Sequence, residues 1–347
     1  MIVYSKSTGL NNAAIGKLET PIKMIIEHES DILTKKGGIC DALFNVEKSS
    51  RFGETIVGGT DFNIFTATAE GEAAPQDTVV ETYQKFIEHI QFMKEFIITA
   101  EMMEDANYGI AADAKHRAET FTRAYYKTMN KICEAALANG TSPMYTYANT
   151  NLDLTTADGK PLFSNNHTWG YTSDATGTQS NYFYGNLFGD GSTEAFEESL
   201  YALAAKIRNM KDENGEALGY TADTLILPGN QPKLESIVKK VCGSEGALGG
   251  NFNDINLHYG NWSIIVLPSW QPADMRVMVM SSEANKNLQG NMFFNRVPLT
   301  VTNWVDNHTG NYIWNGRCRF GVGFGSYKHI LLAVNSTSAV NGATALA

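Results

Sequence analysis

The longest regular pattern in the sequence is an apolar stripe between Ile110 and Ala138. Apolar residues recur there at steps of three and four, which is the period of an α-helix. They are Ile110, Ala114, Ala118, Phe121, Tyr125, Met129, Ile132 and Ala136. The pair Asn139-Gly140 is typical of a helix end. The spacing predicts one helix over about 109–138, roughly 43 Å long. A helix with a single apolar stripe must pack along one continuous surface, and the rest of the chain has to supply that surface.

The segment before this helix reads as two extended runs with a small, acidic connector. Residues 56–65 and 79–87 are rich in β-branched and aromatic residues, whereas residues 66–75 are small or acidic. This arrangement predicts a long β-hairpin. An isolated hairpin is marginal in water, so we expect it to lie on another protein surface. Phe62, Ile64 and Phe65 are the candidate contact residues.

Glu70 and Glu72 lie in the connector, near Asp77. The run lacks the alternating ligands and closing acid of a calcium loop. We expect a solvated acidic tip, or one that meets basic residues of a neighbouring copy. The basic side would come from Lys85, Lys94 or the polar face of the long helix.

The remaining chain mixes helix and strand patterns. Residues 1–50 show no independent core, and a short helix or two is expected between 10 and 52. Glu101–Asn107 suits a helix start, and 141–190 reads as loop with little regular structure. Helices are predicted at 192–210 and 232–241, and the tail after Asn335 is expected to end the fold. Strands are predicted at 94–100, 224–228, 262–268, 275–280, 297–305, 318–324 and 328–334. This order predicts an α+β protein in which an α/β segment is inserted between the long helix and the last strands.

The charge of the chain excludes some function classes. The net charge is −10 and the sequence pI is about 5.2, which is not the basic footprint of tight nucleic-acid binding. Only 18% of the residues are charged, below the usual share of about 25%, and depletion of charge is typical of protein interfaces. A soluble protein with loops rich in glycine and asparagine is the alternative interpretation.

Motifs for catalysis, metals and membranes are missing from the sequence. It contains no phosphate loop, no H-E-x-x-H and no G-x-S-x-G. None of the seven histidines has a metal-ligand partner at the usual spacing. Ser164 and His167 would be the pair of a hydrolase, but no orienting acid or oxyanion hole can be named for them. The four scattered cysteines predict free thiols. We therefore expect no enzyme activity, no cofactor, no metal and no membrane segment.

Three segments, in this order, carry a resemblance to a known family. They are Thr66–Pro75 (TATAEGEAAP), Phe96–Asp105 (FIITAEMMED) and Asp158–His167 (DGKPLFSNNH), the last followed by Asp223–Pro228 (DTLILP). With the long helix between the second and third, the chain resembles the major capsid proteins of tailed bacteriophages. These proteins share the Hong Kong 97-type fold, and the third segment resembles the Mu-type head proteins.

The resemblance implies a division of the chain. Residues 1–53 would be an N-terminal arm, and 54–90 an extended loop. A peripheral domain would comprise 91–190 and 296–347, built on the long helix as its spine, and 191–295 would form an axial domain.

The resemblance also implies a structural head protein of the virion. Copies would assemble in the host bacterial cytoplasm, as pentamers and hexamers, into an icosahedral shell around double-stranded DNA held without sequence-specific contacts. Phe62, Ile64, Phe65, Glu70 and Glu72 would be assembly contacts. Further partners would be a scaffolding protein, a portal and decoration proteins.

Two departures from the family and three alternatives complete these expectations. The chain begins almost directly at the arm, so we expect no pro-segment and a separate scaffolding protein. Residues 52–84 contain no lysine, so we expect no covalent cross-link through the loop. The alternatives are a compartment shell of the encapsulin type, a hydrolase using Ser164 and His167, and an extracellular adhesin, which we do not expect because no secretion signal supports it.

Overall fold

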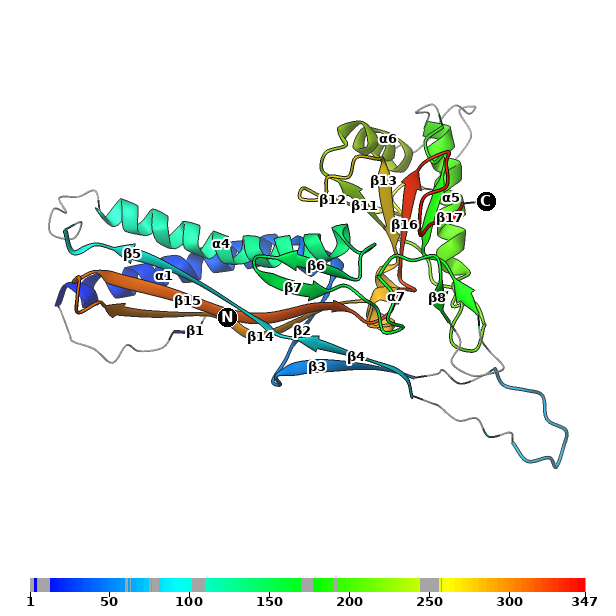
Figure 1. Cartoon of the computed structure of the whole chain (residues 1–347), viewed down its shortest axis with the longest axis horizontal. Helices are drawn as coiled ribbons and strands as arrows, with labels where there is room; N and C mark the ends of the chain where they lie inside the picture. The colour runs from blue at the N-terminus through cyan, green and yellow to red at the C-terminus, as the bar shows by residue number, and fades with distance from the viewer. Residues whose placement is uncertain are drawn as a thin grey trace. The chain divides into compact units, whose positions relative to one another are not determined.

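The computed structural model of the protein (Figure 1) describes most of the chain, in two compact units. The described residues are 3–4, 13–59, 62, 64–74, 76, 81–101, 110–169, 177–189, 193–243, 256 and 258–346. Unit 1 comprises Met1–Glu54, Ile87–Cys133 and Phe293–Val322, and unit 2 comprises Thr55–Phe86, Glu134–Met292 and Gly323–Ala347. Helices and sheets occur together in the chain, which confirms the α+β prediction.

The sheet of unit 1 is formed mainly by long strands. Its order is β1-β14-β15-β5, with β2 also paired to β14. The strands are β1 (Val3–Tyr4), β2 (Asn45–Lys48), β5 (Ile90–Ile98), β14 (Asn291–Val305) and β15 (Tyr312–Phe324). Strands β5 and β15 are antiparallel, with Ile98 opposite Tyr312 and Ile90 opposite Phe320. Three predicted strands are therefore longer than their sequence patterns indicated, since β5 begins at 90, β14 at 291 and β15 at 312.

Helix α4 (Ile110–Ala138) confirms the predicted long helix. Of the expected stripe, Ala114, Ala118, Phe121, Ile132 and Ala136 are buried, while Tyr125 and Met129 are half-buried. The side chain of Ile110 lies outside the described part. Lys115, Arg123, Lys127 and Lys131 are exposed, so the helix has one buried and one polar face over most of its length.

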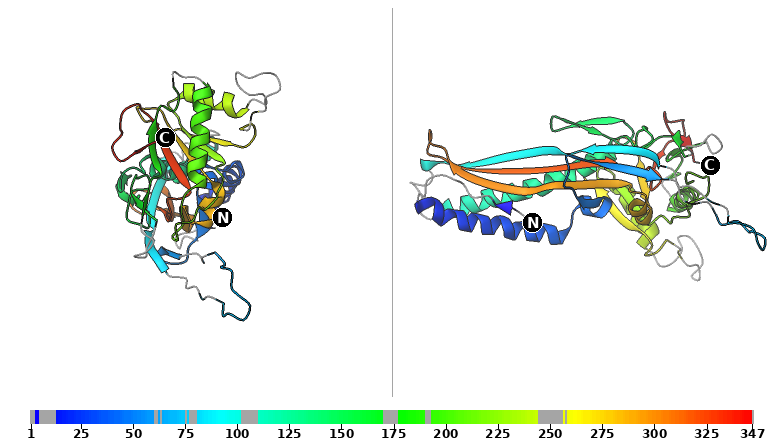
Figure 2. Two further views of the ribbon diagram at one scale, coloured as in Figure 1. Left: turned by 90° about the vertical axis from the view of Figure 1, so that its right-hand side faces the viewer. Right: turned by 90° about the horizontal axis from the view of Figure 1, so that it is seen from below.

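The N-terminal segment differs from its prediction. Helix α1 (Ala13–Lys36) is long, and α2 (Ile39–Leu43) follows it. Helices α1 and α4 lie side by side along the sheet of unit 1 (Figure 2). Ile22 and Ile26 of α1 are buried in one cluster with Phe121 of α4 and Trp314 of β15. The expectation of short helices without a core was wrong, because apolar partners of α1 such as Phe121 and Trp314 lie more than 90 positions away in the sequence.

Unit 2 is built on a six-stranded sheet in the order β12-β11-β13-β16-β10-β17. The strands are β10 (Tyr182–Gly185), β11 (Thr224–Pro228), β12 (Ser263–Leu267), β13 (Arg276–Met280), β16 (Ile330–Asn335) and β17 (Thr344–Ala345). Helices α5 (Thr193–Arg208) and α6 (Pro232–Gly243) cover one face. Alternate residues such as Val277 and Val279 face these helices, while Met278 and Met280 are equally buried. Helix α7 (Ser282–Asn287) follows β13 and is capped by the Ser281 side chain.

Two expectations about unit 2 were wrong. The segment 141–190, predicted to be loop, contains β6 (Met144–Tyr147), β7 (Thr150–Asp153), β8 (His167–Thr168), β9 (Thr178–Gln179) and β10. Strands β6 and β7 pair across Ala148 and Asn149, whose φ angles are 47° and 64°, as a tight hairpin turn requires. The tail after Asn335 returns as β17, parallel to β10. These strands are too short to show a period in the sequence.

Strands β3 (Gly53–Gly59) and β4 (Glu81–Glu88) pair with each other in a separate two-stranded sheet. This agrees with the predicted hairpin at the base of the extended loop, and residues 64–68 and 72–74 have no regular structure. The helix start predicted at Glu101–Asn107 falls largely outside the described residues.

The two units divide the chain differently from the four predicted domains. Residues 134–190 and 323–347, expected in the peripheral domain, belong to unit 2 together with 191–292. Residues 323–347 belong to unit 2 because β16 and β17 complete the sheet that β11, β12 and β13 begin. The names of arm, peripheral domain and axial domain remain predictions.

Candidate assembly surface

The extended loop, residues 54–90, exposes large apolar side chains. Phe62, Ile64 and Phe65 have exposed fractions of 71%, 72% and 105%. Single exposed apolar residues are common on monomers, but these three lie within four positions of one another in the sequence. The three candidate contact residues are therefore all exposed in the isolated subunit.

Glu70 and Glu72 form a compact exposed turn. The backbone N–H of Glu72 donates to the carbonyl of Ala69 at 3.1 Å, and the Glu72 carboxylate accepts from the Ala69 N–H at 3.1 Å. Gly71 has a φ of 90°, a conformation that favours glycine. The turn therefore closes locally, and the Glu70 side chain stays exposed.

Close packing and an ion pair fix the strands of the loop within unit 2. A Cβ at Gly58 of β3 would lie 2.3 Å from the Tyr83 ring of β4, so this position has no room for a side chain. Lys85 of β4 is buried and donates to Asp153 at 2.5 Å and to the Thr155 hydroxyl at 2.6 Å. Burial would raise the pKa of Asp153, but the hydrogen bonds from Lys85 and Thr155 lower it overall.

Lys85 is therefore unavailable to a neighbouring copy, which corrects one of the expected basic partners. On the polar face of α4, Arg117 is paired with Asp113 at 2.8 Å and Arg123 with Glu29 of α1 at 2.5 Å. Among the described residues, no carboxylate lies within ion-pair distance of Lys127 or Lys131. These two lysines are the exposed basic residues that α4 leaves for an external acidic group.

One face of the sheet of unit 1 carries exposed apolar side chains beside basic and acidic ones, with Glu95 between Met93 and Ile97 on β5. Met93 and Ile97 of β5 have exposed fractions of 57% and 42%, and they lie opposite Arg317 and Ile313 of β15. Residues directly opposite share one face of a sheet. Arg317 donates from Nε to the Gln91 side chain at 3.1 Å. About half of each of the Met93 and Ile97 side chains is therefore exposed in the isolated subunit.

A groove of about 530 Å³ lies within unit 1 between β5 and α4. Its lining includes Phe96, Ile97 and Phe121 together with Lys94 and Arg117. The Arg117 guanidinium donates to the carbonyl of Ile97 at 2.7 Å. Glu95 and Thr120 also line the groove, so it brings together apolar, basic and acidic groups.

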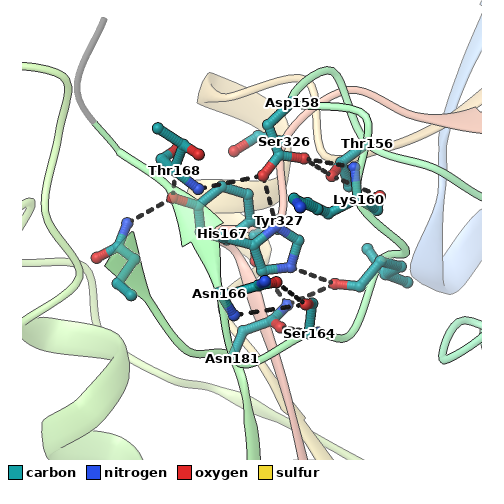
Figure 3. Close-up of polar contacts among 12 residues, drawn as sticks. Thr156, Asp158, Lys160, Ser164, Asn166, His167, Thr168, Asn181, Ser326 and Tyr327 are labelled. Atoms are coloured by element: carbon teal, nitrogen blue, oxygen red, sulfur yellow. Dashed lines mark hydrogen bonds and ion pairs between the residues drawn. The ribbon is translucent and has the colours of Figure 1, made fainter. Parts of the chain in front are cut away.

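The segment that suggested a hydrolase forms a buried hydrogen-bonded joint in unit 2 (Figure 3). His167 is fully buried, and its Nδ1 lies 2.8 Å from the Asp158 carboxylate and its Nε2 3.2 Å from the carbonyl of Leu162. Its ring stacks on Tyr327 with a centroid distance of 3.8 Å. The Ser164 hydroxyl instead donates to the Asn166 side chain at 2.8 Å. The structure therefore does not bring Ser164 and His167 together as nucleophile and base.

The same joint holds together segments far apart in the chain. The Asn181 amide donates to the carbonyls of Leu162 and Ile330, at 2.7 and 3.3 Å, and its oxygen accepts from the Ser164 N–H at 2.9 Å. Burial would raise the pKa of Asp158, but hydrogen bonds from His167, Thr156 and Lys160 lower it. The arrangement is that of a structural hydrogen-bonded pair, His167 and Asp158, whose side-chain oxygens and nitrogens all have partners.

The described residues contain no group of three or more histidine, cysteine or acidic side chains placed to hold a metal ion. No helix in that part of the chain is long and apolar enough to cross a membrane. Cys40, Cys133, Cys242 and Cys318 are buried free thiols, as predicted.

Comparisons with known proteins complete the description. A protein-family model described as phage capsid protein matches residues 82–333. No curated protein sequence matches the chain. The capsid of an empty GTA particle is similar in structure, with 14% identity, a TM-score of 0.48 and coverage of 86% of this chain and 90% of that one. The capsid of cyanophage P-SCSP1u has 10% identity, a TM-score of 0.49 and coverage of 85% and 87%. A chain from Mycobacterium phage Patience has 14% identity, a TM-score of 0.46 and coverage of 98% and 92%.

Proposed function

The chain belongs to the phage capsid protein family and is a structural protein of the virion shell, and we propose that its copies assemble through the extended loop as pentamers and hexamers. Repeated over a closed icosahedral shell, contacts of modest free energy give a stable particle, because each new subunit engages several neighbours at once. The proposed content is double-stranded DNA. An acidic subunit with net charge −10 makes no tight electrostatic contacts to DNA and leaves it free to move during packaging.

The observation that carries this proposal is the exposure of Phe62, Ile64 and Phe65. Burying a large apolar side chain is worth about 1.5–3 kcal/mol. In a monomer these three side chains stay exposed and contribute no free energy of burial. A second copy that covers the loop buries them, and the contact between the two copies gains that free energy. The exposed Met93 and Ile97 of β5 offer apolar surface of the same kind for a subunit contact.

We propose further that the acidic turn meets Lys127 and Lys131 of a neighbouring copy. Support comes from charge complementarity, since Glu70 and Glu72 are exposed and the two lysines have no ion-pair partner among the described residues. Such contacts at an exposed surface contribute more to the rate and orientation of association than to its affinity.

The double substitution Glu70→Gln and Glu72→Gln tests the electrostatic contact. The glutamine at 72 keeps an acceptor for the Ala69 N–H, so the turn is retained. We expect slower shell assembly at low salt, measured by light scattering, and a rate equal to that of wild type at high salt, where exposed charges are screened. An equal rate at low salt would remove these residues from the assembly contacts.

A scaffolding protein, a portal and decoration proteins are proposed partners of the shell, and assembly is proposed to occur in the cytoplasm of a bacterial host. We also propose that the protein has no catalytic role. Support comes from the Ser164 and His167 side chains, whose hydrogen bonds are directed to Asn166, Asp158 and Leu162 rather than to each other.

The shell proposal has a direct test. The chain is expressed alone and together with a candidate scaffolding protein, and the products are viewed by negative-stain electron microscopy. We expect hollow particles of uniform size. A subunit that stays monomeric in both preparations contradicts the proposal. Particles purified from infected cells that contain a protein cargo instead of DNA would favour the compartment alternative.

A further inference from the structure

Three side chains meet where the extended loop begins and ends, all within unit 1. Ser49 directly follows β2, Glu54 lies in β3, and His89 lies between β4 and β5. The Ser49 hydroxyl donates to the Glu54 carboxylate at 2.6 Å, and His89 Nε2 lies 2.8 Å from the same hydroxyl. We call these three residues the root cluster.

The hydrogen bonds assign the tautomer of His89. The Ser49 hydroxyl has one proton, which it gives to Glu54, and it also accepts the Arg51 N–H at 3.2 Å. His89 must therefore donate from Nε2. Its Nδ1 is buried and has no hydrogen-bond partner in the described structure. A Cβ at Gly321 would lie 2.8 Å from Nδ1, so nothing larger than glycine fits beside it.

The surroundings of His89 oppose a positive charge. The side chain is 3% exposed and lies edge-on to Phe294, with ring centroids 6.3 Å apart. The charged groups that act on it are Arg319 of β15, Arg296 of β14 and Glu54 of β3. Burial and the two arginines lower the pKa of His89, and Glu54 offsets part of this effect.

The root cluster is also fixed to the sheet of unit 1. The Ser49 N–H donates to the carbonyl of Asn295 at 3.1 Å, and Arg319 donates from Nε to the carbonyl of His89 at 3.2 Å. Both ends of the extended loop are thus tied to β14 and β15 through residues around one histidine ring.

We propose that the root cluster is a latch that positions the extended loop for assembly, and that proton uptake by His89 opens it. The proposal rests on the proposed role of the loop in shell assembly. A proton on Nδ1 would place a buried charge beside two arginines with no acceptor for the new N–H, so the ring must leave its site. Ser49 would then lose the donor on which its position between Glu54 and Arg51 depends.

The direction of the pH effect follows from the lowered pKa. An unfolded or opened chain has a histidine with a pKa of about 6.5, whereas the latched histidine takes up its proton only at lower pH. The latch is therefore fully stable above the ordinary value and weakens as the pH falls from there through the lowered pKa.

Hydrogen exchange of the unassembled subunit tests the latch itself. Peptides covering 49–54 and 87–90 are compared at about pH 7.5 and about pH 5, on either side of the ordinary histidine pKa, after correction for the intrinsic pH dependence of exchange. We expect about a tenfold or greater loss of protection at the lower pH and no change in the middle of α4. Equal protection at the two pH values overturns the proposal.

The variants separate protonation from mere structure. His89→Gln keeps an N–H donor toward Ser49 but cannot become charged, so its exchange should be the same at both pH values. Ser49→Ala removes the shared hydroxyl and should raise exchange at both. His28→Gln, at an exposed position of α1, should behave as wild type. A His89→Gln protein that retains the wild-type pH dependence would overturn the proposal, and if that variant fails to fold, the wild-type exchange data decide.

Assembly yield as a function of pH distinguishes failure of the latch from failure of the proposed function. Wild type and His28→Gln should lose shells as the pH falls, whereas His89→Gln should retain them to lower pH. Shells with the same pH profile in all three proteins would overturn the control of assembly by His89. Absence of shells in every protein at every pH would overturn the proposed function and, with it, the role of the latch in assembly, leaving the exchange result to stand for the latch alone.

Discussion

Phenylalanine occupies two opposite environments in this protein. Phe188 and Phe196 stack in the core of unit 2 with ring centroids 5.2 Å apart, and both are buried. Phe62 and Phe65 in the extended loop are among the most exposed large apolar side chains described. The free energy of burying a phenylalanine ring therefore has a different role in each environment. In the core of unit 2 it stabilises the subunit, and in the exposed loop it is left for the proposed contact between subunits.

The largest effect on the free energy of unfolding is expected from truncating a side chain in the core. Phe196→Ala should lower the free energy of unfolding of the subunit by about 3–5 kcal/mol, because it removes a fully buried ring and leaves a cavity. Chemical denaturation of the unassembled subunit measures the change. Phe65→Ala is the matched control, and a similar loss of stability in both variants would contradict the distinction between the two environments.

A smaller effect is expected at the joint around His167. Asp158→Asn removes the charge that faces a buried histidine and should cost about 3 kcal/mol of unfolding free energy at neutral pH. Since the pKa of Asp158 is lowered from its ordinary 3.8, its contribution is complete above that value and is lost as the pH falls through the lowered pKa.

The pH dependence provides the check on this second prediction. The difference in unfolding free energy between wild type and Asp158→Asn should shrink as the pH falls below about 4. Asp31→Asn, at an exposed position of α1, should show no comparable pH-dependent difference. A difference for Asp158→Asn that is constant with pH would indicate loss of packing rather than loss of the Asp158 charge.

The smallest effect on stability is expected in the loop. The triple substitution Phe62→Ser, Ile64→Ser and Phe65→Ser should change the unfolding free energy by less than about 0.5 kcal/mol, because the side chains make no core contacts. The same preparation should assemble poorly, as judged by the fraction sedimenting as particles. Met144→Ser, another exposed apolar position in unit 2, controls for a general loss of surface hydrophobicity. Normal assembly of the triple variant would remove the loop from the subunit interface.

Sequence patterns predicted the helices and strands that show a clear apolar pattern over neighbouring residues. The bounds of α4 followed from an apolar stripe over many turns, and α5, α6 and β11 lie within two residues of their predicted limits. The full length of helix α1 was not predicted, because Pro21 interrupts its apolar pattern and proline usually breaks a helix interior. Strand β17 pairs with a strand more than 150 positions earlier, and no local pattern records such a partner.

The candidate assembly surface was predictable to a similar extent. The exposure of Phe62, Ile64 and Phe65 followed from a hairpin too long to bury its own residues. The ion pair of Lys85 with Asp153 and the bond of Ser49 with His89 join residues 68 and 40 positions apart. Their types are common in any sequence, so only the fold identifies them.

The buried thiols have a practical consequence for these experiments. Burial raises the pKa of Cys242 to about 11 and that of Cys318 to about 12, so neither forms the reactive thiolate at neutral pH. Cys40 and Cys133 are equally enclosed. A cysteine placed in the loop by Ala73→Cys would then be the accessible thiol of a folded subunit. A fluorophore attached there would report, in real time and without further mutation, when one copy covers the loop of another.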